Sequence, residues 1–128
     1  MSVAILIVSH SADVARGTAD MARQMAGQDL TIAWSGGNPA GGLGTSMAAI
    51  SAQLEVIWRS DGIAILVDVG GAETNSEMAI EELNPQRAAS VRICQAPLVE
   101  GAIMAAAEAA SGGTLDEVCR AAEDFLRG

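Results

Sequence analysis

Short apolar runs alternate with longer segments of helical periodicity along the chain. Residues 3–8, VAILIV, form a continuous apolar run of strand length, as expected of a parallel strand buried on both faces. Three further strand-length runs cover residues 30–34, 63–67 and 91–94. Between these runs, apolar residues at helical spacing predict helices over residues 12–25, 47–57, 75–83, 97–110 and 114–125.

Local signals predict the ends and the buried faces of these helices. Thr74 with Glu77, and Thr114 with Glu117, have the spacing of capping boxes, which predicts a helix start at each place. Val14, Met21 and Met25, with Thr18 between them, form the face predicted for the first helix. The apolar face predicted for the last helix consists of Leu115, Val118, Ala122 and Phe125. The alanine-rich stretch at residues 102–110 is either a closely packed helix face or a subunit contact.

The alternation of strands and helices predicts an α/β fold, a three-layer sandwich in which a four-stranded, mainly parallel sheet carries helices on both faces. The length of 128 residues corresponds to one domain, residues 1–128. In open sheets of this kind, ligands bind beyond the carboxyl ends of the strands. The segments that follow those ends are residues 9–11, 35–45, 68–74 and 95–97.

The charge pattern excludes several classes of function. The chain has 16 acidic and 7 basic residues, and its formal net charge is −9. Because the basic residues are scattered, binding to nucleic acid or to a membrane is disfavoured. All seven are arginine, so the lysine of a Walker phosphate loop or of a Schiff base is missing. One histidine and two distant cysteines do not make a four-ligand zinc site, and we expect no metal and no other cofactor.

The apolar stretches and the cysteines bear on the compartment. Cys94 and Cys119 stand singly in apolar surroundings and are expected to be small buried side chains in a reducing compartment. The first eleven residues lack the basic segment and the cleavage site of a signal peptide. No uncharged apolar run approaches the roughly 20 residues that span a bilayer. These observations predict a cytoplasmic protein.

His10 is the one histidine, and it directly follows the first predicted strand. A histidine at an arbitrary position is usually a non-catalytic residue of intermediate burial. This one stands at a strand end, between two serines and beside a helix N-terminus, where a phosphate is stabilised by unpaired N–H groups and by the helix dipole. The position favours a nucleophilic imidazole.

A nucleophilic imidazole attacks through one nitrogen while the other holds the proton, and a nearby carboxylate fixes that tautomer. Asp68, the residue after the third strand, is the best-placed carboxylate. The alternative, held equally open, is a turn-forming aspartate that caps the following helix.

Glycine-rich segments surround these two residues and fit an anion pocket, because glycine lets backbone N–H groups approach a phosphoryl oxygen. The candidate pocket residues are Ser11, Gly44, Thr45, Gly70 and Gly71. Neither segment has the dinucleotide or Walker pattern, which disfavours a bound nucleotide. A Ser-His-Asp hydrolase is also disfavoured, since no G-x-S-x-G motif is present.

Four stretches match a known family in order along the chain. They are IVSHS after the first strand, GLGTS before the second helix, LVDVGGAETNSEMAIE after the third strand and APLVEGAIMAA after the fourth. From residue 5 to about residue 118, the chain resembles the phosphotransferase subunit of bacterial phosphoenolpyruvate-dependent dihydroxyacetone kinases, which is built on the mannose-type enzyme IIA domain. The resemblance implies strand order 2-1-3-4 and a homodimer.

The resemblance also implies a function. His10 would accept a phosphoryl group from the phosphocarrier protein HPr and pass it to ADP bound in the nucleotide-binding subunit of the kinase. Asp68 matches the aspartate partner of that histidine. Members commonly read Leu-Gly-Ser-Ala after this aspartate, whereas this chain has Val69-Gly70-Gly71-Ala72 and lacks the hydroxyl. Two alternatives stay open: the IIA domain of a mannose-type sugar transporter, and a regulatory module whose phosphorylation controls binding to another protein.

Overall fold

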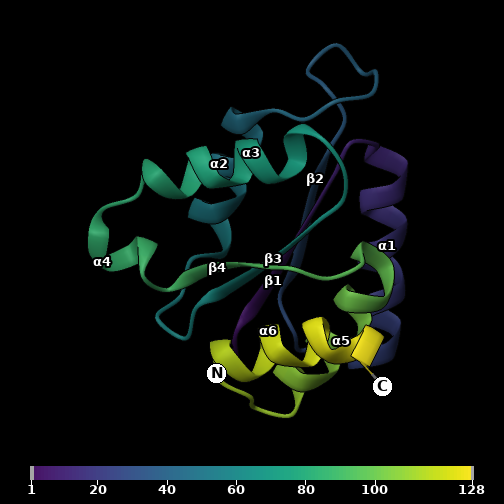
Figure 1. Cartoon of the computed structure of the whole chain (residues 1–128), viewed down its shortest axis with the longest axis vertical. Helices are drawn as coiled ribbons and strands as arrows, with labels where there is room; N and C mark the ends of the chain where they lie inside the picture. Colours follow the sequence, from purple (N-terminus) through teal and green to yellow (C-terminus); the bar gives the residue numbers. More distant parts are fainter. Residues whose placement is uncertain (1, 128) are drawn as a thin grey trace.

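The computed structural model describes residues 2–127, and a sheet of four parallel strands forms its centre (Figure 1). The strands are β1 (Ala4–Ser9), β2 (Ile32–Gly36), β3 (Ile63–Val67) and β4 (Val91–Cys94). Their order in the sheet is β2-β1-β3-β4, and every pairing is parallel. This arrangement confirms the predicted α/β class and the strand order that the resemblance implied.

Helices cover both faces of the sheet, which gives the three layers. They are α1 (Ala12–Ala26), α2 (Met47–Ile57), α3 (Gly71–Glu81), α4 (Pro85–Ala88), α5 (Leu98–Ala110) and α6 (Leu115–Glu123), followed by the 3₁₀ turn η1 (Asp124–Arg127). Helices α1, α5 and α6 share one hydrophobic core with the sheet, whereas α2 and α3 share the other.

Strand β1 lies between β2 and β3, and all six of its residues are buried. Ile5 and Ile7 point into the core under α1 and α5, while Leu6 and Val8 point into the core under α2. Because both faces are covered, the strand reads as a continuous apolar run with no alternation. The burial of a continuous run explains why this strand was the clearest signal in the sequence.

The buried face of α1 differs from the predicted one. Val14, Met21 and Met25 are exposed, and of the predicted face only Thr18 is buried, together with Ala15, Ala19 and Ala22. The small residues face α5, where Ala102, Ala105, Ala106 and Ala109 are buried in the same core. Alanines on both helices let the two backbones come close, and the larger side chains of α1 are turned outward. The alanine-rich stretch is therefore a packed helix face within the chain.

We expect Ala19→Leu to destabilise the fold by about 1–3 kcal/mol, because Ala19 is fully buried and three extra carbons overfill the contact of α1 with α5. Met25→Ala is the matched control on the same helix. Met25 is 67% exposed, so its loss should change stability by less than about 0.5 kcal/mol. Urea unfolding gives the free energy of unfolding of both variants. A larger loss of stability in Met25→Ala than in Ala19→Leu would contradict this packing.

Two predicted helix features are wrong. Helix α3 begins at Gly71, four residues before the predicted start, and the capping box of Thr74 with Glu77 is not formed, because both residues lie inside the helix. Gly70, with φ 63°, ends the preceding turn and occupies the cap position. Phe125, assigned to the buried stripe of the last helix, lies in η1 and is 42% exposed. The second capping box, at Thr114 and Glu117, is confirmed.

The register of the sheet positions the site. Val8 of β1 lies opposite Val67 of β3, and Ser9 lies opposite Gly36 of β2. The residue after β3, Asp68, is therefore brought to the end of β1. Since the chain crosses to β2 on one side of β1 and to β3 on the other, this edge is the switch point of the strand order, where ligands bind in open parallel sheets.

Candidate functional site

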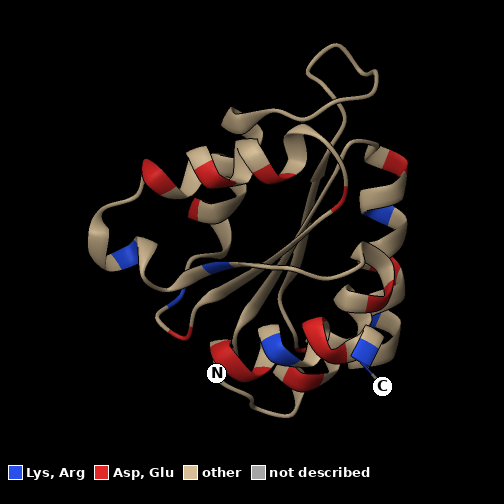
Figure 2. Cartoon of the chain, viewed as in Figure 1, with Lys and Arg blue, Asp and Glu red and all other residues tan. Residues whose placement is uncertain are grey.

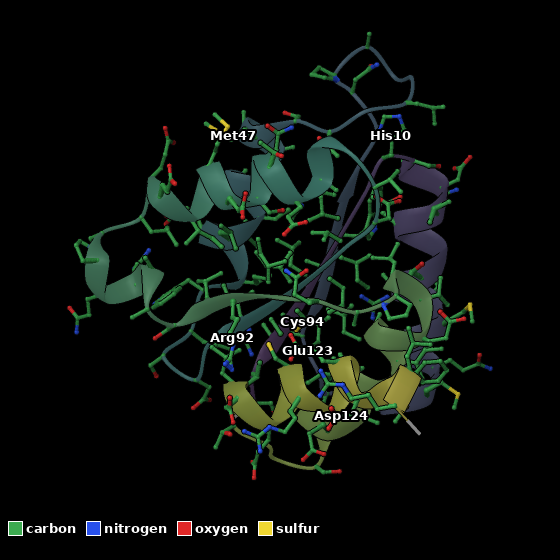
Figure 3. The ribbon with its side chains drawn as sticks, in the orientation of Figure 1. His10, Met47, Arg92, Cys94, Glu123 and Asp124 are labelled. Atoms are coloured by element: carbon green, nitrogen blue, oxygen red, sulfur yellow. The ribbon has the colours of Figure 1, made fainter. Side chains whose placement is uncertain are left out.

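His10 follows β1 at the switch point, where Figure 3 labels it at the carboxyl edge of the sheet, and its side chain is partly buried. Its backbone carbonyl accepts a hydrogen bond from the N–H of Gly44, with a donor–acceptor distance of 2.7 Å. The imidazole has no hydrogen bond to any of residues 2–127. The backbone of this residue is thus fixed, and its ring is free to bond to an incoming group.

Asp68 lies beside His10, and its carboxylate binds the backbone at the end of β1. The N–H of His10 donates to the two carboxylate oxygens at 3.0 and 3.3 Å, and the hydroxyl of Ser9 donates to Oδ2 at 2.6 Å. Among residues 2–127, no hydrogen bond joins this carboxylate to the imidazole. The structure therefore brings the two predicted residues together through the main chain.

Ser9 is a site residue that the sequence reasoning did not select. It is fully buried, and its hydroxyl accepts from the N–H of Ser11 at 3.0 Å while donating to Asp68. The hydroxyl thus links the carboxylate to the residues on both sides of His10. Its position as a polar residue at the end of a buried strand was the available signal.

Helices α1, α2 and α3 begin at this edge, as α5 does after β4, because helices that connect parallel strands run opposite to them. Ser11 caps α1 by accepting from Val14 N–H, and Ser46 caps α2 by accepting from Ala49 N–H. Gly70 precedes α3 without a side-chain cap. The unpaired N–H groups and the positive ends of the helix dipoles favour an anion at this edge. Ser11, predicted to contact phosphate, is engaged as a cap.

Asn38 organises the glycine loop between β2 and α2. Its Oδ1 accepts from the N–H groups of Ala40 and Gly42, and its Nδ2 donates to the carbonyl of Leu43. The loop returns to the site at Gly44, whose N–H is used by the carbonyl of His10. Gly44, a predicted phosphate-pocket residue, therefore lies next to His10, and its N–H bonds to the chain and not to a free ligand position.

The predicted pocket residues Thr45 and Gly71 lie against each other. Thr45 Oγ1 accepts from Asn75 Nδ2 at 2.6 Å, which ties the glycine loop to α3. A Cβ on Gly71 would come within 3.0 Å of Thr45 Oγ1 and 3.4 Å of Asn75 Nδ2. The Cβ of a serine at this position would be in tight contact with both side chains. Glycine at position 71 therefore leaves room for the Thr45–Asn75 hydrogen bond. Asn75 was not selected from the sequence.

We expect Gly36→Ala to disturb the site, because a Cβ there would lie 2.7 Å from the carbonyl oxygen of Ser11 and 2.9 Å from Ala12 Cα. Both are backbone atoms, so the start of α1 must shift, at a cost of about 1–3 kcal/mol. Gly17→Ala, with no atom within 4 Å of its Cβ, is the control and should be stabilising by roughly 0.5–1 kcal/mol. Thermal unfolding compares the two; equal melting temperatures would contradict the close approach.

Charged side chains do not form the anion site. Figure 2 shows the arginines separated over several elements. Six of them pair with an acidic side chain within 3.5 Å: Arg16, Arg23, Arg87, Arg92, Arg120 and Arg127. The seventh, Arg59, donates to Thr31 Oγ1 and to backbone carbonyls. Recognition of a phosphoryl group at this edge therefore depends on backbone N–H groups.

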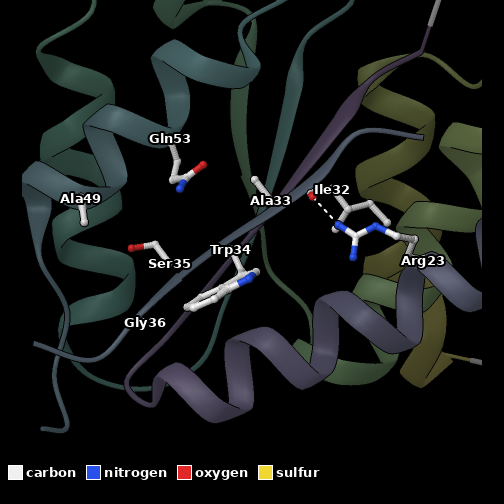
Figure 4. Close-up of a pocket in the computed structure, with 8 residues that line it drawn as sticks. All are labelled: Arg23, Ile32, Ala33, Trp34, Ser35, Gly36, Ala49 and Gln53. Carbon is white, nitrogen blue, oxygen red and sulfur yellow. Dashed lines mark hydrogen bonds between the residues drawn. The ribbon is translucent and has the colours of Figure 1, made fainter. Parts of the chain in front are cut away.

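Two cavities lie along β2 and the glycine loop, and His10 lines neither of them. A recess of about 300 Å³ at the start of α1 is lined by residues of that helix and of the glycine loop, together with Ser11. A larger one, of about 480 Å³, follows the outer edge of β2 between Arg23 and Gln53 and does not include His10 (Figure 4). Within residues 2–127, no cluster of three metal-ligating side chains and no helix able to span a membrane is present.

Comparison with known proteins shows similarity over most of the chain. Residues 4–119 match the family EIIA-man, described as PTS system fructose IIA component. A protein of Klebsiella michiganensis, named PEP-dependent dihydroxyacetone kinase, phosphoryl donor subunit DhaM, is 39% identical over 97% of this chain and 27% of its own length. A protein of Listeria innocua, named PEP-dependent dihydroxyacetone kinase 2, phosphoryl donor subunit DhaM, is 36% identical over 83% of this chain and 85% of its own length.

The chain spans only about a quarter of the length of its longer relatives. It matches 27% of the Klebsiella michiganensis protein and 25% of a relative of the same name from Escherichia coli. Among solved structures, a crystallised protein of unknown function is 30% identical and superposes with a TM-score of 0.86, covering 97% of this chain and 95% of its own. Because the family match covers all four strands, helices α1 to α5 and the first residues of α6, the chain belongs to the EIIA-man family of PTS IIA components.

Proposed function

We propose that this chain is a phosphohistidine carrier of a phosphoenolpyruvate-dependent dihydroxyacetone kinase, with His10 as the residue that carries the phosphoryl group. The observation that carries the proposal is the position of the chain's one histidine, at the switch point with its ring unbonded and its backbone held by Asp68. The names of the relatives, phosphoryl donor subunits of this kinase, support the same role.

In the loading step, a ring nitrogen of His10 attacks the phosphorus of the phosphorylated donor, which we propose to be HPr. A nitrogen–phosphorus bond forms on His10, the donor's bond to phosphorus breaks, and its electron pair stays with the donor. The backbone N–H groups at the helix starts stabilise the charge that spreads over the phosphoryl oxygens, so positioning and fixed dipoles do most of the work. No metal or cofactor on this chain takes part in the proposed step.

In the unloading step, an oxygen of the terminal phosphate of ADP attacks the same phosphorus. The nitrogen–phosphorus bond breaks, its electron pair returns to the imidazole, and ATP forms on the nucleotide-binding subunit, which then phosphorylates dihydroxyacetone. We propose Asp68 as the residue that fixes the His10 backbone for both in-line attacks. The phosphate pocket that we propose around His10 consists of Ser11, Gly44, Thr45, Gly70 and Gly71.

The deciding experiment follows a labelled phosphoryl group. The protein is labelled with phosphoenolpyruvate, enzyme I and HPr, purified, and mixed with the ADP-loaded nucleotide-binding subunit of the kinase. We expect label to leave the protein and appear in ATP, and then in dihydroxyacetone phosphate. Label that passes instead to the IIB domain of a mannose-type transporter would assign the chain to sugar uptake. Label that stays, with stable binding to a regulator, would assign a regulatory module.

A further inference from the structure

The two cysteines, which are 25 positions apart in sequence, meet in the core. Cys94 is the last residue of β4, and Cys119 lies in the middle of α6. Their Sγ atoms are 2.7 Å apart, and the two residues are 0% and 1% exposed. Their burial was predicted, but their contact was not, because neither residue has a nearby partner in the sequence. The structure adds a buried dithiol that links a strand to the last helix.

The surroundings make one of these thiols the nucleophile. The thiol of Cys94 donates a hydrogen bond to the sulfur of Cys119, and the guanidinium of Arg92 lies beside the pair (Figure 3). These two contacts lower the pKa of the Cys119 thiol against the opposing effects of burial and of Glu123. The same hydrogen bond and burial raise the pKa of Cys94. Arg92 Nε, which is buried, has no hydrogen-bond partner among residues 2–127, so its N–H is available to the thiolate, while the other two guanidinium nitrogens donate to Asp116.

The two sulfurs are also close enough to bond. A disulfide has a sulfur–sulfur distance of 2.03–2.05 Å, so the thiols need to approach by only about 0.7 Å. We propose that Cys94 and Cys119 form a dithiol modification site that reacts with low-molecular-weight disulfides and closes to an internal disulfide between β4 and α6. The site is separate from His10, which Figure 3 labels at the carboxyl end of β1 above the label of Cys94, and it does not depend on the proposed function.

The reaction is an exchange in two steps. The thiolate of Cys119 attacks one sulfur of the reagent, forming a mixed disulfide and releasing one reagent thiol. The sulfur of Cys94 then attacks Cys119 Sγ, the mixed disulfide breaks, and the second reagent thiol leaves. Two protein thiols are oxidised to one disulfide, the reagent disulfide is reduced to two thiols, and the two protons go to the departing thiolates.

Access requires a local opening of the last helix. Helix α6 is amphipathic, with Val118, Cys119 and Ala122 buried and most of its other residues partly or fully exposed. A reagent reaches Cys119 Sγ when this helix loosens from β4, so oxidation is expected to be slow, at a rate set by the population of the opened state and by the reactivity of the thiol in it. After the bond has formed, the same opening is prevented.

The bond constrains the unfolded chain as well. It closes a loop of 25 positions, for which the chain-entropy estimate and the unfolding entropy of a domain of this size predict a rise in melting temperature of about 10 °C. The full-length protein is incubated under native conditions with oxidised glutathione, and its intact mass is measured before and after treatment. Thermal unfolding is then recorded for the oxidised and reduced samples.

We expect a monomer that has lost two hydrogen atoms, carries no glutathione and melts about 10 °C higher, with the rise reversed by dithiothreitol. Cys94→Ser and Cys119→Ser are matched controls, each compared with itself before and after oxidation, so a change in their basal stability does not affect the reading. Neither should form the bond or gain stability. Unreacted thiols, a persistent glutathione adduct, or a disulfide-linked dimer in the unsubstituted protein would each overturn the proposal.

Discussion

Replacing His10 by alanine is expected to abolish phosphoryl acceptance completely. The chain has one histidine, so no second imidazole at the carboxyl edge can take over. The variant is incubated with labelled phosphoenolpyruvate, enzyme I and HPr, and the protein-bound phosphate is tested for acid lability, the property of a phosphohistidine. We expect acid-labile label on the unsubstituted protein and none on the variant.

The fold should survive this change. The imidazole makes no hydrogen bond to residues 2–127, and the interactions that fix position 10 come from its N–H and carbonyl groups, which alanine keeps. We expect a change in unfolding free energy of less than about 0.5 kcal/mol. Asp13→Ala is a control near the site, since its side chain is 86% exposed, and it should be labelled normally. Acid-labile phosphate on the His10 variant would rule out His10 as the carrier.

The positions of the strands, and the polar residues at the carboxyl edge of the sheet, could be predicted from the sequence. A strand buried on both faces is a continuous apolar run, which is visible in the local sequence. The runs at residues 63–67 and 91–94 coincide with β3 and β4, and the polar residues that follow a buried strand mark its carboxyl end. His10 and Asp68 follow two neighbouring strands, so a parallel sheet necessarily brings them to one edge. Their proximity therefore needed only the strand order.

The helix faces were harder to predict, because size competes with hydrophobicity. Met21 and Met25 are the more apolar choices, yet α1 packs on an alanine face of α5, where a methionine has no room. Nothing local in α1 reveals which partner it meets. Similarly, Thr74 and Glu77 have the spacing of a capping box, but Gly70 allows the turn to close earlier, and the helix starts there.

The partners of Asp68 could not be predicted either. A carboxylate near a histidine suggests a contact with the ring, but the hydrogen bonds of Asp68 go to the Ser9 hydroxyl and to the His10 N–H, across 59 and 58 positions. Such contacts depend on where the side-chain atoms at the ends of β1 and β3 lie to within a fraction of an ångström, which a sequence pattern does not specify. The same holds for Asn75 of α3, whose bond to Thr45 in the glycine loop joins residues 30 positions apart.

Removing the Asp68 carboxylate should therefore affect both stability and transfer. In Asp68→Ala, the buried Ser9 hydroxyl and the His10 N–H lose their acceptor. Leaving such groups unpaired costs about 1–3 kcal/mol each, so we expect a loss of about 3 kcal/mol in total. With its backbone released, His10 is displaced from the in-line position, and a displacement of about 1 Å costs roughly 10²-fold in rate.

Two further variants separate the contribution of the carboxylate from that of the hydroxyl. Ser9→Ala removes the link to Ser11 but leaves the bond between Asp68 and the His10 N–H, so we expect a loss of about 1 kcal/mol and roughly a tenfold slower transfer. Glu77→Gln, an exposed carboxylate on α3, should change neither quantity.

Rates are measured by rapid-quench transfer from labelled HPr, at a temperature where every variant is folded. Since the chain has a single histidine, its amide resonance can be assigned directly, and hydrogen exchange at this amide reports the bond to Asp68. We expect faster exchange at His10 in Asp68→Ala and slower transfer in the order Asp68→Ala, Ser9→Ala, unsubstituted protein. If Asp68→Ala transfers phosphoryl groups at the normal rate although hydrogen exchange at its His10 amide is faster, backbone fixation by this carboxylate does not contribute to phosphoryl transfer.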